Sequence, residues 1–421
     1  MPEATIDHMV ALTVFLAALL LFITLFNQTI QTAILYQQHR YIASKCTDML
    51  DNIMLTPGYP TYWGMGNTTP SSFGLQDPEF TQYRLSPFSL MRLAALENKN
   101  TSIYYSGTNM WNSTPVYYSE TNMWYSNITM GFGDFLLVPY NEAINYTTVG
   151  QLLGTNNSFG FQLTIQPVIT VSVSESLLMN QRVPTVKVSG ASFPLSRANL
   201  SYCLFTADFH GNSPSYAILY DEANTDGKGF AYLKPYPQIQ DPNAVYVLIV
   251  YAHLSGLTGV GYYQRGSEDK QYIVPFVNDF NSGSVILAHS YDIHDFGPPN
   301  ADLTYNATYV ILTEDFKLRE MPMENATGMV NYGNGNFSYG SLTIPTMNPG
   351  ILVITYRKSA NEGGFILMPW GISSMAFPIV FGDTTTGREW VATDIRQVTV
   401  GGIAYQAKLA LWSLQGYQVI G

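Results

Sequence analysis

The clearest pattern in the chain is an unbroken apolar run near its beginning. Residues 9–26 (MVALTVFLAALLLFITLF) contain no charged residue, proline or glycine, and a helix of that length is just able to cross a membrane. Apolar residues then recur every three or four positions from Ile30 to Ile53, with Gln, Arg and Lys between them. The first helix breaker is Pro57, so the sequence predicts one continuous helix from about residue 4 to residue 54.

Such a helix would be roughly 75 Å long at about 1.5 Å per residue. Its first half suits lipid or the surfaces of other helices, whereas its second half is amphipathic. A cleaved secretory signal is the competing interpretation, but no small-residue cleavage site follows the apolar run. The polar residues Asn27, Gln28 and Thr29 mark the point where a break is most expected. They also form a sequon (Asn-x-Ser/Thr), which we expect to stay unmodified inside a helix.

The remainder of the chain is rich in turn-forming and β-forming residues and predicts a mostly-β head. Residues 55–165 indicate an irregular, aromatic-rich α+β layer that includes a short helix at 86–96, with Ser86 as its cap and Pro87 at its first position. Residues 166–265 contain seven short strand patterns about ten residues apart, which is typical of a β-sandwich. Residues 266–421 predict a second all-β domain, with a loop at 331–341. The expected fold class is therefore α+β: a domain of residues 1–54, the long hydrophobic helix, followed by this head.

Composition argues against one class of function. Only 12% of the residues are charged and the net charge is −11, so nucleic-acid binding is not expected. The two cysteines, Cys46 and Cys203, lie in different contexts; we interpret them as unpaired small hydrophobic residues, with a disulfide as the alternative.

Potential glycosylation sites indicate that the head is exported. The sequons outside the helix are Asn67, Asn100, Asn112, Asn127, Asn145, Asn156, Asn199, Asn306, Asn325 and Asn336. Against this, Arg40 and Lys45 follow the apolar run while Glu3 and Asp7 precede it, and the positive-inside rule alone would keep the head in the cytoplasm. The two observations agree if a short basic leader was removed, and we expect an extracellular, cell-surface protein with a membrane-inserted precursor and N-linked glycans.

The acid-flanked start EATIDHMVAL, the apolar run to Phe26 and the continuation QTIQTAILYQQHRYIASKCTDMLDNIML together resemble archaeal type IV pilins and pilin-like surface proteins. The resemblance covers roughly the first 55 residues. It implies a helical homopolymer whose core is built from this helix, formed by subunits that lie in the membrane before assembly. The chain departs from the pattern because it begins with Met1 and shows no leader.

The resemblance also implies which residues would make the assembly contacts. They are Leu12, Phe15, Leu16, Leu19, Leu20, Ile23 and Phe26, with Glu3 or Asp7 as the acid that neutralises the α-amino group of an adjacent subunit. An acid that simply lies in interfacial water is the equally weighted alternative. Within the head, residues 185–205 and 225–233 resemble immunoglobulin-like modules of prokaryotic surface proteins.

Two clusters carry possible metal ligands. In DEANTDGKG (221–229), Glu222, Asn224 and Asp226 alternate as in a calcium loop, but Leu233 occupies the place of the bidentate acid. A hairpin turn at Asp226-Gly227 explains the same residues better. The second cluster is HSYDIHD (289–295), in which His289 and His294 would point to opposite faces of a strand; a solvated loop is the favoured interpretation. We therefore expect no metal, no cofactor and no enzymatic activity, with an exported glycosidase as the remote alternative.

A duplicated tract remains to be explained. YYSGTNMW (104–111) recurs as YYSETNMW (117–124), and Tyr, Trp, Met and Asn are residues typical of interfaces. An ordinary aromatic hairpin is the favoured interpretation, followed by subunit–subunit contact and then by stacking on sugars.

Taken together, these features predict a structural subunit of a type IV pilus-like filament that polymerises through its N-terminal helix and exposes a glycosylated head. The alternative is a single-pass, membrane-anchored surface glycoprotein or adhesin that binds a cell-surface or carbohydrate ligand.

Overall fold

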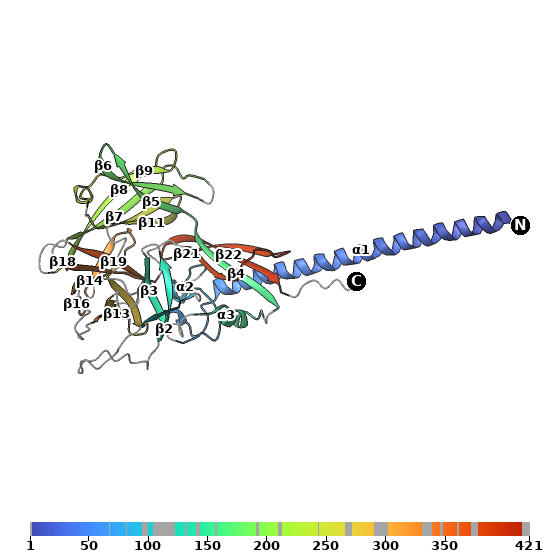
Figure 1. Cartoon of the computed structure of the whole chain (residues 1–421), viewed down its shortest axis with the longest axis horizontal. Helices are drawn as coiled ribbons and strands as arrows, with labels where there is room; N and C mark the ends of the chain where they lie inside the picture. Colours follow the sequence, from blue (N-terminus) through green and yellow to red (C-terminus); the bar gives the residue numbers. More distant parts are fainter. Residues whose placement is uncertain are drawn as a thin grey trace.

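The computed structural model has one long helix that projects from a head of antiparallel sheets, with the N-terminus at the free end of the helix (Figure 1). This confirms the expected order of an apolar N-terminal helix and a mostly-β head. The structure describes residues 2–66, 68–80, 82–94, 100–103, 123–130, 133–139, 144–155, 158–190, 193–208, 213–242, 244–265, 272–289, 302–330, 339–345, 348–359, 362–371 and 378–414.

Helix α1 (Pro2–Leu55) is continuous, as predicted, because neither glycine nor an internal proline interrupts it. The expected weak point at Asn27–Thr29 is helical, and the Thr29 hydroxyl donates to the Leu25 carbonyl at 2.8 Å. Near its C-terminal end one face of α1 is buried in the head. The residues of that face are Ile42, Cys46, Met49, Leu50, Ile53 and Met54. Their spacing by threes and fours places them on one side of the helix.

That face of α1 packs on a four-stranded sheet of order β20-β4-β22-β21. Its strands are β4 (Phe159–Pro167), β20 (Ile379–Gly382), β21 (Ala392–Val400) and β22 (Ile403–Ser413). Strand β22 lies between β4 and β21 in this sheet. Its residues were not predicted to form a strand. Since β4 belongs to the predicted segment 55–165 and the other three strands to 266–421, one sheet spans two of the predicted segments.

A polar network fixes α1 against this sheet. The Arg396 guanidinium on β21 donates to Asp51 of α1 and to Asp394, both at 2.8 Å. The Cys46 thiol points at the Leu409 carbonyl of β22, with the sulfur 3.4 Å from the oxygen. Burial and the nearby Asp394 carboxylate raise the pKa of Cys46 to about 11, and burial raises the pKa of Cys203 to about 12. Both cysteines are free and buried, which confirms their interpretation as small apolar side chains.

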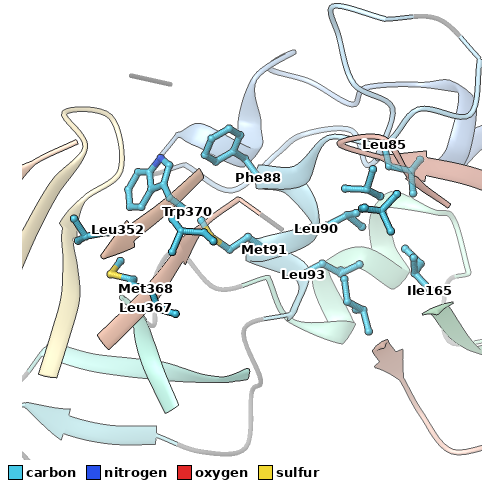
Figure 2. Packing of buried hydrophobic residues seen from close by; sticks show 14 of the residues in the cluster. Leu85, Phe88, Leu90, Met91, Leu93, Ile165, Leu352, Leu367, Met368 and Trp370 are labelled. Carbon is cyan, nitrogen blue, oxygen red and sulfur yellow. The ribbon is translucent and has the colours of Figure 1, made fainter. Parts of the chain in front are cut away.

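The described residues include four short helices. Helix α2 (Pro87–Ala94) begins at Pro87 as predicted, and the Ser86 hydroxyl accepts from the Ser89 amide at 3.3 Å. Figure 2 shows Phe88 and Met91 of α2 beside Trp370, while Leu90 and Leu93 point toward Leu85 and Ile165. The other short helices are η1 (Trp63–Met65), α3 (Tyr146–Leu152) and η4 (Pro237–Ile239).

All seven strands predicted within 166–265 are present and form two sheets. One sheet has the order β5-β6-β9 and the other β11-β10-β7-β8. The strands are β5 (Thr170–Leu178), β6 (Gln181–Ser189), β7 (Asn199–Asp208), β8 (Ser215–Asn224), β9 (Phe230–Tyr232), β10 (Tyr246–Leu254) and β11 (Leu257–Arg265). Apolar residues of both sheets share a separate core that includes Val186, Leu200 and Leu248.

Strand β10, inside the β11-β10-β7-β8 sheet, is buried on both faces over most of its length. Along β10, Leu248 and Val250 belong to the core shared with β5-β6-β9, while Val247, Ile249 and Tyr251 belong to the main core of the head. This explains why β10 reads as a continuous apolar run rather than an alternating one. Strand β5 crosses β11 so closely that a Cβ on Gly261 would lie 2.2 Å from the Val171 carbonyl oxygen.

The remaining strands form three sheets. One has the order β12-β13-β17 and a second has the order β1-β2-β3. In the third, β14 pairs along one edge with β18, and β18 pairs with β19. Along its other edge β14 pairs with both β15 and β16. The bounds are β1 (Asn100–Ile103), β2 (Met123–Met130), β3 (Gly133–Pro139), β12 (Ile273–Asp279), β13 (Ser284–His289), β14 (Leu303–Leu312), β15 (Leu318–Met321), β16 (Thr327–Val330), β17 (Gly340–Thr343), β18 (Gly350–Ser359) and β19 (Glu362–Trp370). The short strands β15, β16 and β17 were not predicted from the sequence.

The Arg396 network generates a prediction about the attachment of α1. In Arg396→Gln, Asp51 and Asp394 lose a shared charged donor, and we expect the free energy of unfolding to fall by about 1–2 kcal/mol. Maleimide labelling of Cys46 should accelerate more than labelling of Cys203, because Cys46 lies in the contact between α1 and the sheet. The matched control is Lys317→Gln, which breaks an exposed ion pair with Asp315 away from α1. Equal acceleration at both cysteines would show that Arg396 supports the whole fold and not this contact.

Candidate functional site: the projecting helix

The projecting part of α1, residues 2–38, is called the stalk. An 18-residue window within α1 has a mean hydropathy of 2.8, and none of it is buried. The predicted apolar assembly residues all lie on the stalk, and each exposes between 43% and 64% of its surface. They are Leu12, Phe15, Leu16, Leu19, Leu20, Ile23 and Phe26. A surface this apolar is found on helices that are covered by lipid or by other helices.

Four threonine hydroxyl groups of the stalk bond to its own backbone. Thr13, Thr24, Thr29 and Thr32 each donate to the backbone carbonyl four residues earlier. These internal bonds remove the need for water at those positions, so the side chains are compatible with an apolar environment.

One line of apolar residues continues past the predicted assembly segment. Its members are Leu12, Leu16, Leu19, Ile23, Phe26, Ile30 and Ile34, and all are exposed. Steps of three or four residues keep them on one side of the helix, which is the pattern of a helix–helix contact. The predicted assembly contacts ended at Phe26. Ile30 and Ile34 continue the same spacing of three or four residues and could have been included.

Aromatic and charged residues surround the point where the stalk enters the head. The His39 and Trp390 rings stack with their centroids 4.2 Å apart. The Lys45 ammonium lies 4.3 Å from the centroid of the Phe159 ring, and Tyr41 lies beside the same ring. These contacts join the part of α1 that directly follows the stalk to β4 and to the segment before β21.

The two candidate acids lie in the first turns of the stalk. Asp7 is exposed. Glu3 is helical, and its side chain is outside the described part of the chain. The proposed pairing of either acid with the α-amino group of another subunit stays a prediction.

The structure distinguishes among the sequons that it describes. Asn145, Asn199 and Asn325 are exposed, and the Asn145 side-chain oxygen accepts from the Thr148 amide at 2.7 Å, leaving its nitrogen available. Asn306 differs because its Nδ2 donates to the Pro214 carbonyl at 3.3 Å from within β14. Asn100 and Asn127 lie in β1 and β2, with side chains outside the described part. Asn67, Asn112, Asn156 and Asn336 are outside the described residues.

The first possible metal cluster forms a turn. The Asp226 carboxylate accepts from the amides of Lys228 and Phe230 at 2.8 and 2.9 Å, so the carboxylate that a calcium loop would use closes the hairpin. These bonds lower the pKa of Asp226. Of the second cluster, His289 is fully buried at the end of β13, so the solvated-loop interpretation is wrong for this residue. Burial lowers the pKa of His289. Asp292, His294 and Asp295 lie outside the described residues.

No group of three or more His, Cys, Asp or Glu side chains within the described ranges is arranged to hold a metal ion. The duplicated tract at 104–111 and 117–124 lies outside those ranges except for Met123 and Trp124, which begin β2, and the predicted loop at 331–341 lies mostly outside them. Comparison with known proteins adds no assignment: no family model matches the sequence, and no curated protein matches it significantly.

The Asp394 carboxylate gives a prediction about pH. Burial opposes ionisation, but hydrogen bonds from Thr47 and Arg396 outweigh it and hold the pKa of Asp394 below its usual 3.8. A carboxyl with a lowered pKa stabilises the fold above its unfolded pKa, and this contribution is lost as the pH falls through the folded value. In Asp394→Asn we expect lower stability at pH 7 and a shallower loss of stability below about pH 4. Urea unfolding of both proteins from pH 7 to pH 2.5 measures this; parallel curves would contradict it.

The sequons give a second prediction. In protein recovered from the cell surface, glycopeptide mass spectrometry should find sugar on Asn145, Asn199 and Asn325. Occupancy at Asn306 should be the lowest of these four, because attaching sugar to Nδ2 requires its bond to Pro214 to break. Unmodified asparagine at all three exposed positions would remove the main argument for an exported head.

Proposed function

We propose that the chain is a structural subunit of an extracellular type IV pilus-like filament, assembled by its stalk and exposing a glycosylated head. The observation that carries this proposal is the length of exposed apolar helix. Copies of the same chain are the proposed partners, and the membrane holds the subunit before assembly. We propose no catalytic role and no cofactor beyond N-linked glycans.

The length of the stalk favours cover by protein over cover by lipid alone. The hydrocarbon core of a bilayer is about 30 Å thick and accommodates about 20 helical residues. A bilayer that covers residues 9–26 therefore leaves most of residues 27–38 outside, roughly 18 Å at about 1.5 Å per residue. That stretch still exposes Ile30, Ile34, Leu35 and Tyr36. Neighbouring stalks would cover those residues, whereas a lone anchor leaves them at the membrane surface or in water.

The junction between stalk and head suits the same role. The helix runs without interruption into the main core, where Leu50, Ile53 and Met54 are fully buried. A force applied to the stalk therefore acts directly on the β20-β4-β22-β21 sheet, because no flexible linker separates them. We also infer that the β5–β11 sandwich is an immunoglobulin-like module; its division into sheets of three and four strands supports this.

The second candidate is a membrane-anchored surface glycoprotein or adhesin held singly by the same helix. The exposed apolar segment of α1 is long enough to cross a membrane, which also supports this candidate. The two functions differ in what happens to the stalk outside the membrane, because only a filament buries it among copies of itself.

A charge placed in the apolar run separates them. With Leu16→Lys, or Leu20→Lys, we expect filaments to disappear, because burying an unpaired ammonium costs several kcal/mol per copy. Electron microscopy of sheared surface material, with the protein identified by immunolabelling, measures the outcome. The matched control is Gln38→Lys, which adds the same charge to an exposed polar position on the same helix and should leave filaments intact. If cells making the unsubstituted protein carry no filament that contains it, the filament proposal is wrong and the anchored glycoprotein is favoured.

A further inference from the structure

A hollow in the surface of the head brings together residues from three loops. Tyr62, Met65 and Gly66 come from the loop that contains η1, Glu79 from the segment before α2, and Asn281 from the turn between β12 and β13. The volume of the hollow is about 420 Å³, which lies within the range of small-molecule sites, about 300–1,000 Å³. None of these residues belongs to α1 or to the sheet on which α1 packs.

A fully buried arginine fixes the first of these loops. The Arg92 guanidinium, on α2, donates to the carbonyl oxygens of Trp63, Gly66 and Thr68. One charged group therefore holds three points of the wall that carries Tyr62. Such a wall loses little conformational freedom when a ligand binds, which lowers the free-energy cost of binding.

Carboxylates close the other two loops. The Asp77 carboxylate accepts from the backbone amide of Glu79 at 3.1 Å. The Asp279 carboxylate accepts from the backbone amide of Asn281 at 3.0 Å and from the Ser282 hydroxyl at 2.7 Å. The backbone at Glu79 and Asn281 is thus positioned without the use of either of their side chains.

Gly66 leaves space in the hollow. Its φ and ψ angles are −101° and 165°, an extended conformation that any residue adopts. A Cβ atom there would lie 3.8 Å from the Trp63 carbonyl oxygen and 4.0 Å from Oδ1 of Asn281, which is an ordinary contact distance. Neither the backbone nor the packing requires glycine at this position, and a larger side chain would fill the space beside Asn281.

The hollow combines an aromatic ring with polar groups that have no partner in the part of the chain that the structure describes. These groups are the Tyr62 hydroxyl, the Glu79 carboxylate and the Asn281 side-chain amide. Tyr62 exposes 51% of its surface, so its ring is accessible from solvent. The lining therefore offers one stacking surface and three polar groups to a ligand.

This combination suits a neutral sugar. One face of a pyranose ring carries C–H groups that pack on an aromatic ring, and its edge carries adjacent hydroxyl groups. A carboxylate and a side-chain amide each present two polar atoms in one plane and bond such a pair of hydroxyls. An ammonium ligand is disfavoured, because cages for it use several aromatic faces and the described lining contains one ring, that of Tyr62.

We propose that the hollow binds a neutral carbohydrate, with one sugar ring stacked on Tyr62 and its hydroxyl groups bonded by Glu79 and Asn281. This binding activity goes beyond the proposed structural role and does not depend on polymerisation. Two sources supply such a ligand: N-linked glycans of neighbouring copies, and glycans of other surfaces.

Sugar binding is measured by saturation-transfer NMR on the full chain, made without N-glycans and kept in a polyoxyethylene detergent that carries neither sugar nor ammonium. The probes are the methyl glycosides of glucose, mannose and galactose. We expect at least one of them to bind with a dissociation constant of about 1 mM. Tyr62→Ala should weaken this binding about tenfold or more. The matched control is Tyr232→Ala, which removes a 60% exposed tyrosine from β9 and should leave binding unchanged.

Two further variants separate the site from the fold and a sugar from a cation. Gly66→Leu should abolish binding by filling the hollow, with an unchanged unfolding midpoint. Glu79→Gln keeps a planar polar group and should weaken sugar binding only a few-fold. If choline binds more tightly than every methyl glycoside, and Glu79→Gln abolishes that binding, the site is a cation site and the carbohydrate proposal is wrong.

The remaining outcomes decide the proposal and the source of the sugar. No binding of any methyl glycoside at up to about 50 mM, or binding that survives both Tyr62→Ala and Gly66→Leu, would overturn the proposal. N-glycans released from the surface of the same cells serve as a further probe. If they bind about tenfold more tightly than the methyl glycosides, neighbouring copies supply the ligand; if they bind more weakly, other surfaces do. Filament formation is scored separately, so that its absence contradicts the proposed function and leaves the sugar site standing.

Discussion

The packing of the second half of α1 on the β20-β4-β22-β21 sheet is the contact on which the rest of the structure depends. It buries one face of the helix, from Ile42 to Met54, against strands that come from opposite ends of the head sequence. The same contact sets the direction of the stalk, because α1 is one continuous helix from its exposed half to its buried half. Charged groups limit how the helix can rotate on the sheet: Arg396 accommodates only the side of α1 that presents Asp51. An apolar face gives affinity, and this ion pair gives orientation.

The head is organised so that few of its sheets stand alone. Strand β10 contributes alternate side chains to two cores, and β4 connects the sandwich directly to the sheet that holds α1. Tyr216 and Tyr220 of β8 also reach across to β15, donating to the Glu320 carboxylate and the Leu318 carbonyl at 3.0 and 3.1 Å. A force on one side of the head is therefore distributed over several sheets. This is the property that a filament subunit needs, and it is of less use to an isolated anchor.

The exposure of apolar side chains to water is the largest unfavourable free-energy contribution in the isolated chain, and it occurs in two places. The stalk exposes apolar residues along its length, and burying each large one is worth about 1.5–3 kcal/mol; the sum greatly exceeds the 5–15 kcal/mol that holds a typical domain together. The turn between β5 and β6 adds a smaller, separate exposed patch at Leu177, Leu178 and Met179. Under the proposed function, other copies of the chain cover the stalk, because the stalks form the interior of the filament.

The sequence by itself determined the elements whose signal is local. The continuous helix α1 follows from the absence of glycine and internal proline, helix α2 from Ser86 and Pro87, and the seven sandwich strands from alternating polarity between turn residues. The stalk's exposed apolar residues were also readable, because their spacing is a property of one helix. The tertiary structure decided what depends on distant partners. Strand β22 carries helix-favouring Ala407, Lys408, Leu409 and Ala410, and becomes a strand only because β4 and β21 bond to both of its edges. The division of the head into sheets and the pairing of Arg396 with Asp51 join residues far apart in sequence, and no local pattern encodes such distances.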